Sequence, residues 1–266
     1  DYFNVHYDEV LICNYDRFED EAEFNRMAEF EKVIMIDYSV TAEIVQKLLD
    51  KNIEVKILDH HANPQTALLK DIKNEKFEYV FDDTKSGTLI AYEYFKPKNA
   101  RTKKIFLEMV KLIDTYDLFK KEHPLWIDAQ NMNRVLYGCL AWGADTPEEQ
   151  YQFIKDYWFN KLKKFDTWTW TDFEQKKIKS AIDKENKQFN ESKACLKKYV
   201  DERGVKYGVT VAKSKVSIVA LRLMEENLDI KYIIMINTYT GKWEKLSLRS
   251  RTEDNFSCNQ FEQCKG

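Results

Sequence analysis

The sequence predicts an α/β protein whose first half contains a parallel sheet with helices on both faces. Two observations lead to this prediction. The apolar runs at Val33–Ile36 and Ile53–Leu58 are typical of strands that are buried on both faces. Between them, residues 41–52 place their apolar side chains on one helical face, with Thr41 as the predicted N-cap. Strand, helix and strand in this order form a βαβ unit, and such units collect functional groups at the carboxyl ends of their strands.

Further elements extend this pattern along the first half. Residues 9–13 are short and apolar and predict an early strand, followed by a charged helical stretch up to Glu31. A strand is predicted at Phe77–Phe81 and a helix at Gly87–Phe95. Residues 101–165 predict several helices, so the parallel sheet is expected to end before them.

The second half begins with a long helix and returns to strands. A capping box at Thr171–Glu174 opens a charged helix that is predicted to run to about Val200. The segments after it predict the order strand, helix, strand, strand, at 205–212, 214–224, 230–236 and 243–248. We therefore predict an α/β/α domain over 1–165, a linker helix over 166–202 and a smaller α/β domain over 203–266. The active site is expected in the cleft between the domains.

Composition excludes several classes of protein. Lysine and arginine number 42 against 45 aspartates and glutamates, so the chain is no basic nucleic-acid coat, and an anionic substrate must meet a local patch or a metal. An aromatic content of 14% argues against general disorder. No apolar run approaches the roughly 18 residues of a membrane span, so no membrane partner is expected. The five cysteines form no Cys-x-x-Cys pair, which predicts a reducing, cytoplasmic location without a disulfide framework.

Chemically useful side chains follow the predicted strands. Asp37 comes directly after the run 33–36, and Asp59-His60-His61 comes directly after the run 53–58. Asp114 follows another apolar segment, 109–113. Carboxylate oxygen and neutral imidazole nitrogen together suit divalent ions such as Mn²⁺, Co²⁺ or Zn²⁺. A pair of such ions holds a phosphate and lowers the pKa of bound water.

The Asp59-His60-His61 triplet at a strand end, with Asp37 ending the preceding strand, resembles the DHH phosphoesterase family. That family includes RecJ-type single-strand exonucleases, nanoRNases, pAp phosphatases and cyclic dinucleotide phosphodiesterases. The resemblance implies two divalent metal ions, with Mn²⁺ expected and Mg²⁺, Co²⁺ or Zn²⁺ as alternatives. By the same resemblance Asp37 bridges the ions, and His60 and Asp114 are further ligands. His61 faces the scissile phosphate, and with Asp59 it forms the catalytic group.

Two other segments resemble substrate-binding elements of the same family. Ser86-Gly87 matches the Ser-Gly pair that opens a helix after the DHH strand. Residues 247–250 resemble the strand of the DHH-associated C-terminal domain, whose arginine binds the phosphate or sugar of the substrate. We therefore expect Ser86, Gly87, Arg249 and Ser250 to contact the substrate.

The sequence departs from the family pattern at two motifs. It contains no His-x-Asp-x-Asp-Gly motif. His6-Tyr7-Asp8 matches only the first part of that motif and lacks the second Asp and the Gly. The family's Gly-Gly-Gly-His segment would begin where Lys265-Gly266 ends this sequence. We expect both motifs to lie outside this sequence. The alternative is a relative that cannot hold two metal ions.

These observations predict metal-dependent hydrolysis of phosphodiester bonds in short or single-stranded nucleic acid. The alternatives are a cyclic dinucleotide or pAp phosphoesterase, a pyrophosphatase-like relative, and a nucleotide-binding module without metal chemistry. The expected partner is a short oligonucleotide, a single strand or a small nucleotide, and a homodimer is left open. The sequence does not separate RNA from DNA.

Two further groups of side chains are assigned to packing or to solvent. Trp158, Trp168 and Trp170 are predicted to pack between domains, with stacking on bases as the alternative. Lys161–Lys164 is predicted to be a solvent-exposed helix face, with contacts to a nucleic-acid backbone as the alternative.

Overall fold

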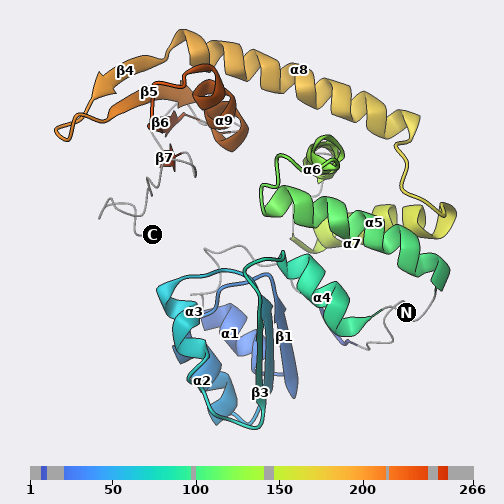
Figure 1. Cartoon of the computed structure of the whole chain (residues 1–266). Coiled ribbons are helices and arrows are strands. Elements are labelled where there is room, and N and C mark those ends of the chain that lie inside the picture. Colours follow the sequence, from blue (N-terminus) through green and yellow to red (C-terminus); the bar gives the residue numbers. More distant parts are fainter. Residues whose placement is uncertain are drawn as a thin grey trace. The chain divides into compact units, whose positions relative to one another are not determined.

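The protein forms two units, residues 1–175 and 176–266, of a mixed α/β fold (Figure 1). The computed structural model describes residues 7–10, 21–96, 100–140, 147–213, 216–238 and 245–250. The boundary between the units falls inside a single helix, α8 (Asp172–Ala194). The segment 166–202, predicted as a separate linker, is therefore divided between the two units.

The first unit contains a three-stranded sheet in which every strand is parallel to its neighbour. Its strands lie in the order β1 (Lys32–Ile36), β2 (Glu54–Asp59) and β3 (Phe77–Phe81). Helix α2 (Ala42–Asp50) connects β1 to β2, and α3 (Pro64–Leu69) lies between β2 and β3. The hydroxyl of Thr41 accepts the N–H of Ile44 and so caps α2, as the sequence predicts. The predicted parallel α/β arrangement is confirmed.

Helices cover both faces of this sheet (Figure 1). On one face, β2 packs its alternate residues Val55 and Ile57 into a buried cluster with α2, α3 and α1 (Glu21–Met27). On the other face, Lys56 reaches Tyr94 of α4 (Gly87–Phe95). Because side chains alternate along a strand, β2 is buried from both sides. This burial fixes the position of its carboxyl end, which carries the candidate site.

A helical layer completes the first unit. It contains α5 (Ala100–Asp117), α6 (Trp126–Leu140) and α7 (Pro147–Lys164). Trp158, Trp168 and Trp170 pack within this unit around the ammonium of Lys161, which lies 4.3 Å from the centre of the Trp168 ring. Lys161 is buried and pairs with Glu174, so the prediction that this lysine faces solvent is wrong. The ion pair and the capping box of α8 share the carboxylate of Glu174.

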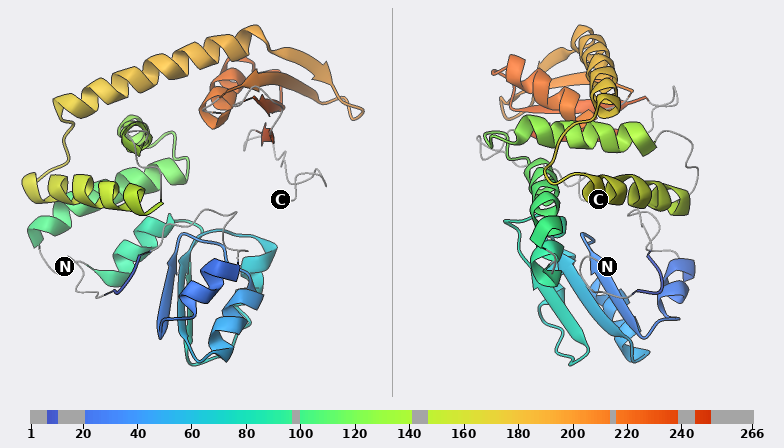
Figure 2. Two further views of the ribbon diagram at one scale, coloured as in Figure 1. Left: turned by 180° about the vertical axis from the view of Figure 1, so that it is seen from behind. Right: turned by 90° about the vertical axis from the view of Figure 1, so that its right-hand side faces the viewer.

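The second unit contains a four-stranded mixed sheet (Figure 2). Its strands lie in the order β4 (Lys197–Val200), β5 (Lys206–Ala212), β6 (Tyr232–Asn237) and β7 (Lys245–Ser250). The central pair β5–β6 is parallel, and both outer pairs are antiparallel. Phe189 of α8 and Leu223 of α9 (Val216–Glu226) are buried in one cluster with Ile233 of β6. A smaller C-terminal α/β unit is therefore present.

Two elements of the structure differ from the prediction, and one predicted element cannot be compared. The long helix ends at Ala194 rather than near Val200, because Lys197–Val200 pairs with β5 as an edge strand. Helix α3 was not predicted. The early strand predicted over 9–13 lies for the most part outside the described residues.

Within the described residues, no helix is both long enough and apolar enough to cross a bilayer.

Candidate metal centre

The candidate site lies at the carboxyl ends of two neighbouring parallel strands. Asp37 follows β1 directly, and its N–H donates to the carbonyl of Leu58, 2.9 Å away, which extends the ladder by one step. Asp59 is the last residue of β2, and His60 and His61 follow it. Since β1 and β2 are parallel and in register, their functional side chains meet at one edge.

The backbone at Asp37 adopts a left-handed conformation, with φ of 59°. This region is unfavourable for residues with a Cβ, although Asp tolerates it better than most. Such strain is frequent where the surrounding structure holds a functional side chain in place. Here the strained residue is Asp37, at the point where the chain leaves the sheet after β1.

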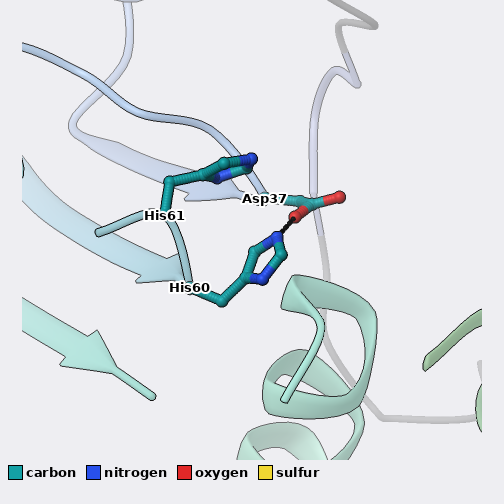
Figure 3. A group of neighbouring side chains, drawn as sticks. All are labelled: Asp37, His60 and His61. Atoms are coloured by element: carbon teal, nitrogen blue, oxygen red, sulfur yellow. Dashed lines mark ion pairs between the residues drawn. The ribbon is translucent and has the colours of Figure 1, made fainter. Parts of the chain in front are cut away.

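Asp37, His60 and His61 bring three potential ligand atoms together (Figure 3). Nε2 of His60 lies 3.1 Å from Oδ1 of Asp37, and the two imidazole rings are 4.3 Å apart, centre to centre. One ligand atom from each of the three residues lies within 4.8 Å of the other two. The side chain of His60 is 12% exposed and that of Asp37 is 41% exposed, so the cluster is open to solvent on the Asp37 side.

Asp59 orients His61. Its carboxylate is fully buried, and Oδ1 lies 2.7 Å from Nδ1 of His61. This hydrogen bond raises the pKa of His61 above its ordinary value, against the opposing effect of burial. Because Nδ1 is engaged, Nε2 is the nitrogen that His61 can offer to an ion or a substrate. Asp59, predicted as part of the catalytic group, thus acts on the cluster through His61.

Helix α5 contributes two aspartates, and they have different surroundings. Asp114, the predicted ligand, accepts the backbone N–H of Ser86 on Oδ1 at 2.8 Å and the ammonium of Lys120 on Oδ2 at 2.6 Å. Asp117, one helical turn later, places Oδ2 3.3 Å from Nε2 of His60. The structure therefore puts Asp117, rather than Asp114, in contact with the cluster.

Negative charge accumulates around Asp117. Burial raises the pKa of this carboxyl, and the nearby carboxylates of Asp37 and Asp114 raise it further. His60 and His61 act in the opposite direction. A cation bound at this edge would relieve the repulsion between the carboxylates, because it stabilises their ionised forms.

Ser86 and Gly87 support the site from the start of α4. The hydroxyl of Ser86 accepts the N–H of Leu89 at 3.2 Å and so caps the helix, while its own N–H holds Asp114. Gly87 lies so close to Asp37 that a Cβ at this position would stand 2.5 Å from Oδ1 of Asp37. Both residues are buried. Their predicted contact with a substrate stays a prediction. The structure shows that Ser86 donates a hydrogen bond to Asp114 and that Gly87 packs against Asp37.

Arg249 and Ser250 belong to β7 in the second unit. The Arg249 side chain is exposed, and Nη2 donates to the hydroxyl of Ser217 of α9 at 3.1 Å. Ser250 is half-buried and pairs with Tyr232 of β6. The expectation that these residues face the Asp37 cluster across a cleft stays a prediction.

Comparison with known proteins does not assign the chain to a family. No family model matches it, and no curated protein matches it. A solved structure described as an uncharacterized protein from Helicobacter pylori G27 is 14% identical, with a TM-score of 0.35 over 87% of this chain and 73% of that chain. This likeness is too weak to carry an argument about the site.

Proposed function

We propose that this protein is a metal-dependent phosphoesterase that hydrolyses phosphodiester bonds in short or single-stranded nucleic acid. The observation that carries the proposal is the cluster of Asp37, His60 and His61 at the carboxyl edge of a parallel sheet. The resemblance of the Asp59-His60-His61 triplet to the DHH family supports the phosphoester substrate class.

The spacing of the donor atoms suits a divalent ion. Two ligand atoms that are each about 2.1 Å from one ion lie roughly 3.0 to 3.4 Å apart, for octahedral or tetrahedral angles respectively. Oδ1 of Asp37 and Oδ2 of Asp117 lie 3.1 Å and 3.3 Å from Nε2 of His60. The mixture of carboxylate and imidazole favours Mn²⁺, Co²⁺ or Zn²⁺, and Mg²⁺ remains an alternative.

The side chains at the carboxyl edge of the first sheet would have different roles in hydrolysis. Asp37 and His60 would hold the ion, with Asp117 next to them. A bound divalent ion supplies a nucleophilic water at neutral pH and an electrostatic partner for the phosphoryl oxygens. In its protonated form, which the hydrogen bond to Asp59 favours by raising the pKa of His61, this imidazole would donate a hydrogen bond from Nε2 to a phosphoryl oxygen. In the second unit, the exposed guanidinium of Arg249 is suited to bind a phosphate group.

One observation favours a second candidate, a nucleotide-binding module without hydrolysis. Both carboxylate oxygens of Asp114 already have partners, so this residue offers no free oxygen for a further ion as it stands. Metal titration separates the two candidates, because the hydrolase requires a bound divalent ion and the binding module does not.

The experiment is a calorimetric titration of EDTA-treated protein with Mn²⁺, followed by an assay with labelled oligoRNA, oligoDNA, pAp, cyclic dinucleotides and pyrophosphate. We expect saturable Mn²⁺ binding and release of mononucleotides from the oligonucleotides. His60→Ala should lose both, while the matched variant His123→Ala, in the loop after α5, should keep both. Equal activity in EDTA would overturn the proposal.

A further inference from the structure

Helix α5 ends in a turn that reverses the chain. Lys120 donates its N–H to the carbonyl of Thr115 at 3.0 Å, and Phe119 donates to Tyr116 at 3.1 Å. These two bonds form a Schellman motif, in which the residue that follows the C-cap of the helix adopts the left-handed conformation. That residue is Phe119, with φ of 53°. Glycine is usual at this position because it has no Cβ, so a phenylalanine here needs support from its surroundings.

Aromatic packing supplies that support. The ring of Phe119 lies 5.3 Å from the ring of Trp126 at a steep angle, and 6.4 Å from the ring of Tyr116. Tyr116 and Trp126 stack on each other at 5.9 Å. The three rings fix the turn between α5 and α6, and thus fix the direction in which the next residue leaves it.

The turn brings Lys120 back over the last turns of α5. Its ammonium lies 2.6 Å from Oδ2 of Asp114. The Asp114 side chain is only 9% exposed, whereas the Lys120 side chain is 37% exposed. An ammonium has three N–H donors, and the one given to Asp114 leaves two that can reach an anion from solvent.

This ammonium belongs to the same edge as the candidate metal centre. Asp114 is bonded to Ser86, whose neighbour Gly87 touches Asp37. Asp117, one turn after Asp114, contacts His60. Lys120 therefore brings a positive charge to an edge where Asp37, Asp59, Asp114 and Asp117 concentrate negative charge.

We propose that Lys120 is a phosphoryl-binding residue of this site, and that Asp114 is the carboxylate that positions it. The ligand is the anionic phosphate group of a nucleotide, whose oxygens accept from the ammonium. The inference deepens the proposed function and rests on it for the identity of the ligand. It also gives Asp114 a role that does not require it to bind a metal ion.

The test compares the affinities of adenosine 5′-monophosphate and adenosine by calorimetry, with and without Mn²⁺. Lys120→Met should weaken binding of the monophosphate about tenfold or more, the size expected when a charge-assisted hydrogen bond is lost. The affinities for adenosine and for Mn²⁺ should change less than about twofold. Lys120→Arg should restore most of the loss. The matched variant Lys121→Met, at the next position along the chain, should bind the monophosphate like the wild type.

The outcomes separate the two proposals. If the wild type binds the monophosphate but no Mn²⁺, and Lys120→Met weakens that binding, the metal proposal fails and the role of Lys120 stands. If Lys120→Met keeps its affinity for the monophosphate, the role of Lys120 is refuted while metal binding is unaffected. Tighter Mn²⁺ binding by Lys120→Met, with unchanged nucleotide affinity, would make Lys120 only a counter-ion of Asp114. If the wild-type protein binds no adenosine 5′-monophosphate, the proposed role of Lys120 is also refuted.

Discussion

A Cβ added at Gly87 would lie 2.5 Å from Oδ1 of Asp37 and 2.7 Å from its Cα, so the first turn of α4 and the end of β1 are in direct contact. Real Cβ atoms do not approach other heavy atoms this closely. One of the atoms in the way is the Cα of Asp37, which cannot move away by a side-chain rotation. The position of the Asp37 carboxylate therefore depends on the absence of a side chain at residue 87.

Gly87→Ala should displace Asp37 and weaken Mn²⁺ binding about 10- to 100-fold, the usual effect of disturbing the support of a ligand. Alanine in a helix is ordinarily more favourable than glycine, so a loss here would report the clash rather than helix propensity. Calorimetric titration with Mn²⁺ measures the effect. Thr88→Ala, at the next position of α4, is the control and should bind Mn²⁺ normally. Normal binding by Gly87→Ala would mean that Asp37 is not a ligand.

The two aspartates of α5 should respond differently to substitution. Asp117→Asn should lower the affinity for Mn²⁺ by at least about tenfold, because the Asp117 carboxylate contacts His60. Asp114→Asn should affect Mn²⁺ less and nucleotide affinity more, since Asp114 holds Lys120. Titrating both variants with Mn²⁺ and with adenosine 5′-monophosphate gives the comparison. If Asp114→Asn lowers the affinity for Mn²⁺ more than Asp117→Asn does, Asp114 rather than Asp117 is the metal ligand.

The sequence predicts that Asp37 and His60 lie close together, but it does not predict which aspartate of α5 contacts them. Asp37 and His60 could be placed because residues at the carboxyl ends of adjacent parallel strands must meet, whatever the rest of the fold does. Asp114 and Asp117 are three residues apart on one helix, so both lie on the same face. Which of them contacts His60 depends on how α5 packs, and no local pattern determines that.

Two missed elements have different explanations. Helix α3 carried a readable signal, because Asn63 before Pro64 is a typical N-cap followed by proline at the first helical position. The Asn63 side chain does accept the N–H of Thr66 at 2.9 Å. Strand β4 carried no comparable signal. All four of its side chains are exposed, so no apolar alternation marks it, and it forms only because β5 pairs with it.

The buried ion pair of Lys161 and Glu174 should be costly to break from either side. The ammonium of Lys161 lies 2.6 Å from Oε1 of Glu174, and both side chains are almost fully buried. Glu174→Gln would leave a buried ammonium without its counter-charge, and we expect a loss of about 3 to 5 kcal/mol in the free energy of unfolding. Glutamine can still serve in the capping box, so the loss reports the charge. Urea unfolding followed by tryptophan fluorescence measures it.

A double variant tests whether the pair stabilises the fold or only avoids a penalty. Burial lowers the pKa of Lys161, and the carboxylate of Glu174 acts in the opposite direction, so removal from water disfavours the charged form of this lysine. Lys161→Met combined with Glu174→Gln should therefore recover much of the stability lost in Glu174→Gln alone. Glu75→Gln, an exposed position between α3 and β3, is the control and should change stability by less than about 0.5 kcal/mol. A double variant clearly less stable than the wild type would show that the pair itself is favourable, and one as stable as the wild type would show that the pair only avoids a penalty.

Protonation of His61 should depend on Asp59 in metal-free protein. The hydrogen bond to Asp59 raises the pKa of His61 above 6.5, so the folded protein holds this proton more tightly than the unfolded chain does. The resulting stabilisation is complete below pH 6.5 and is lost as pH rises through the higher pKa of the folded state. In Asp59→Asn the His61 titration, followed by NMR in EDTA, should move to lower pH, and the loss of stability above pH 6.5 should diminish. An unchanged His61 titration in Asp59→Asn would show that the buried carboxylate does not control this imidazole.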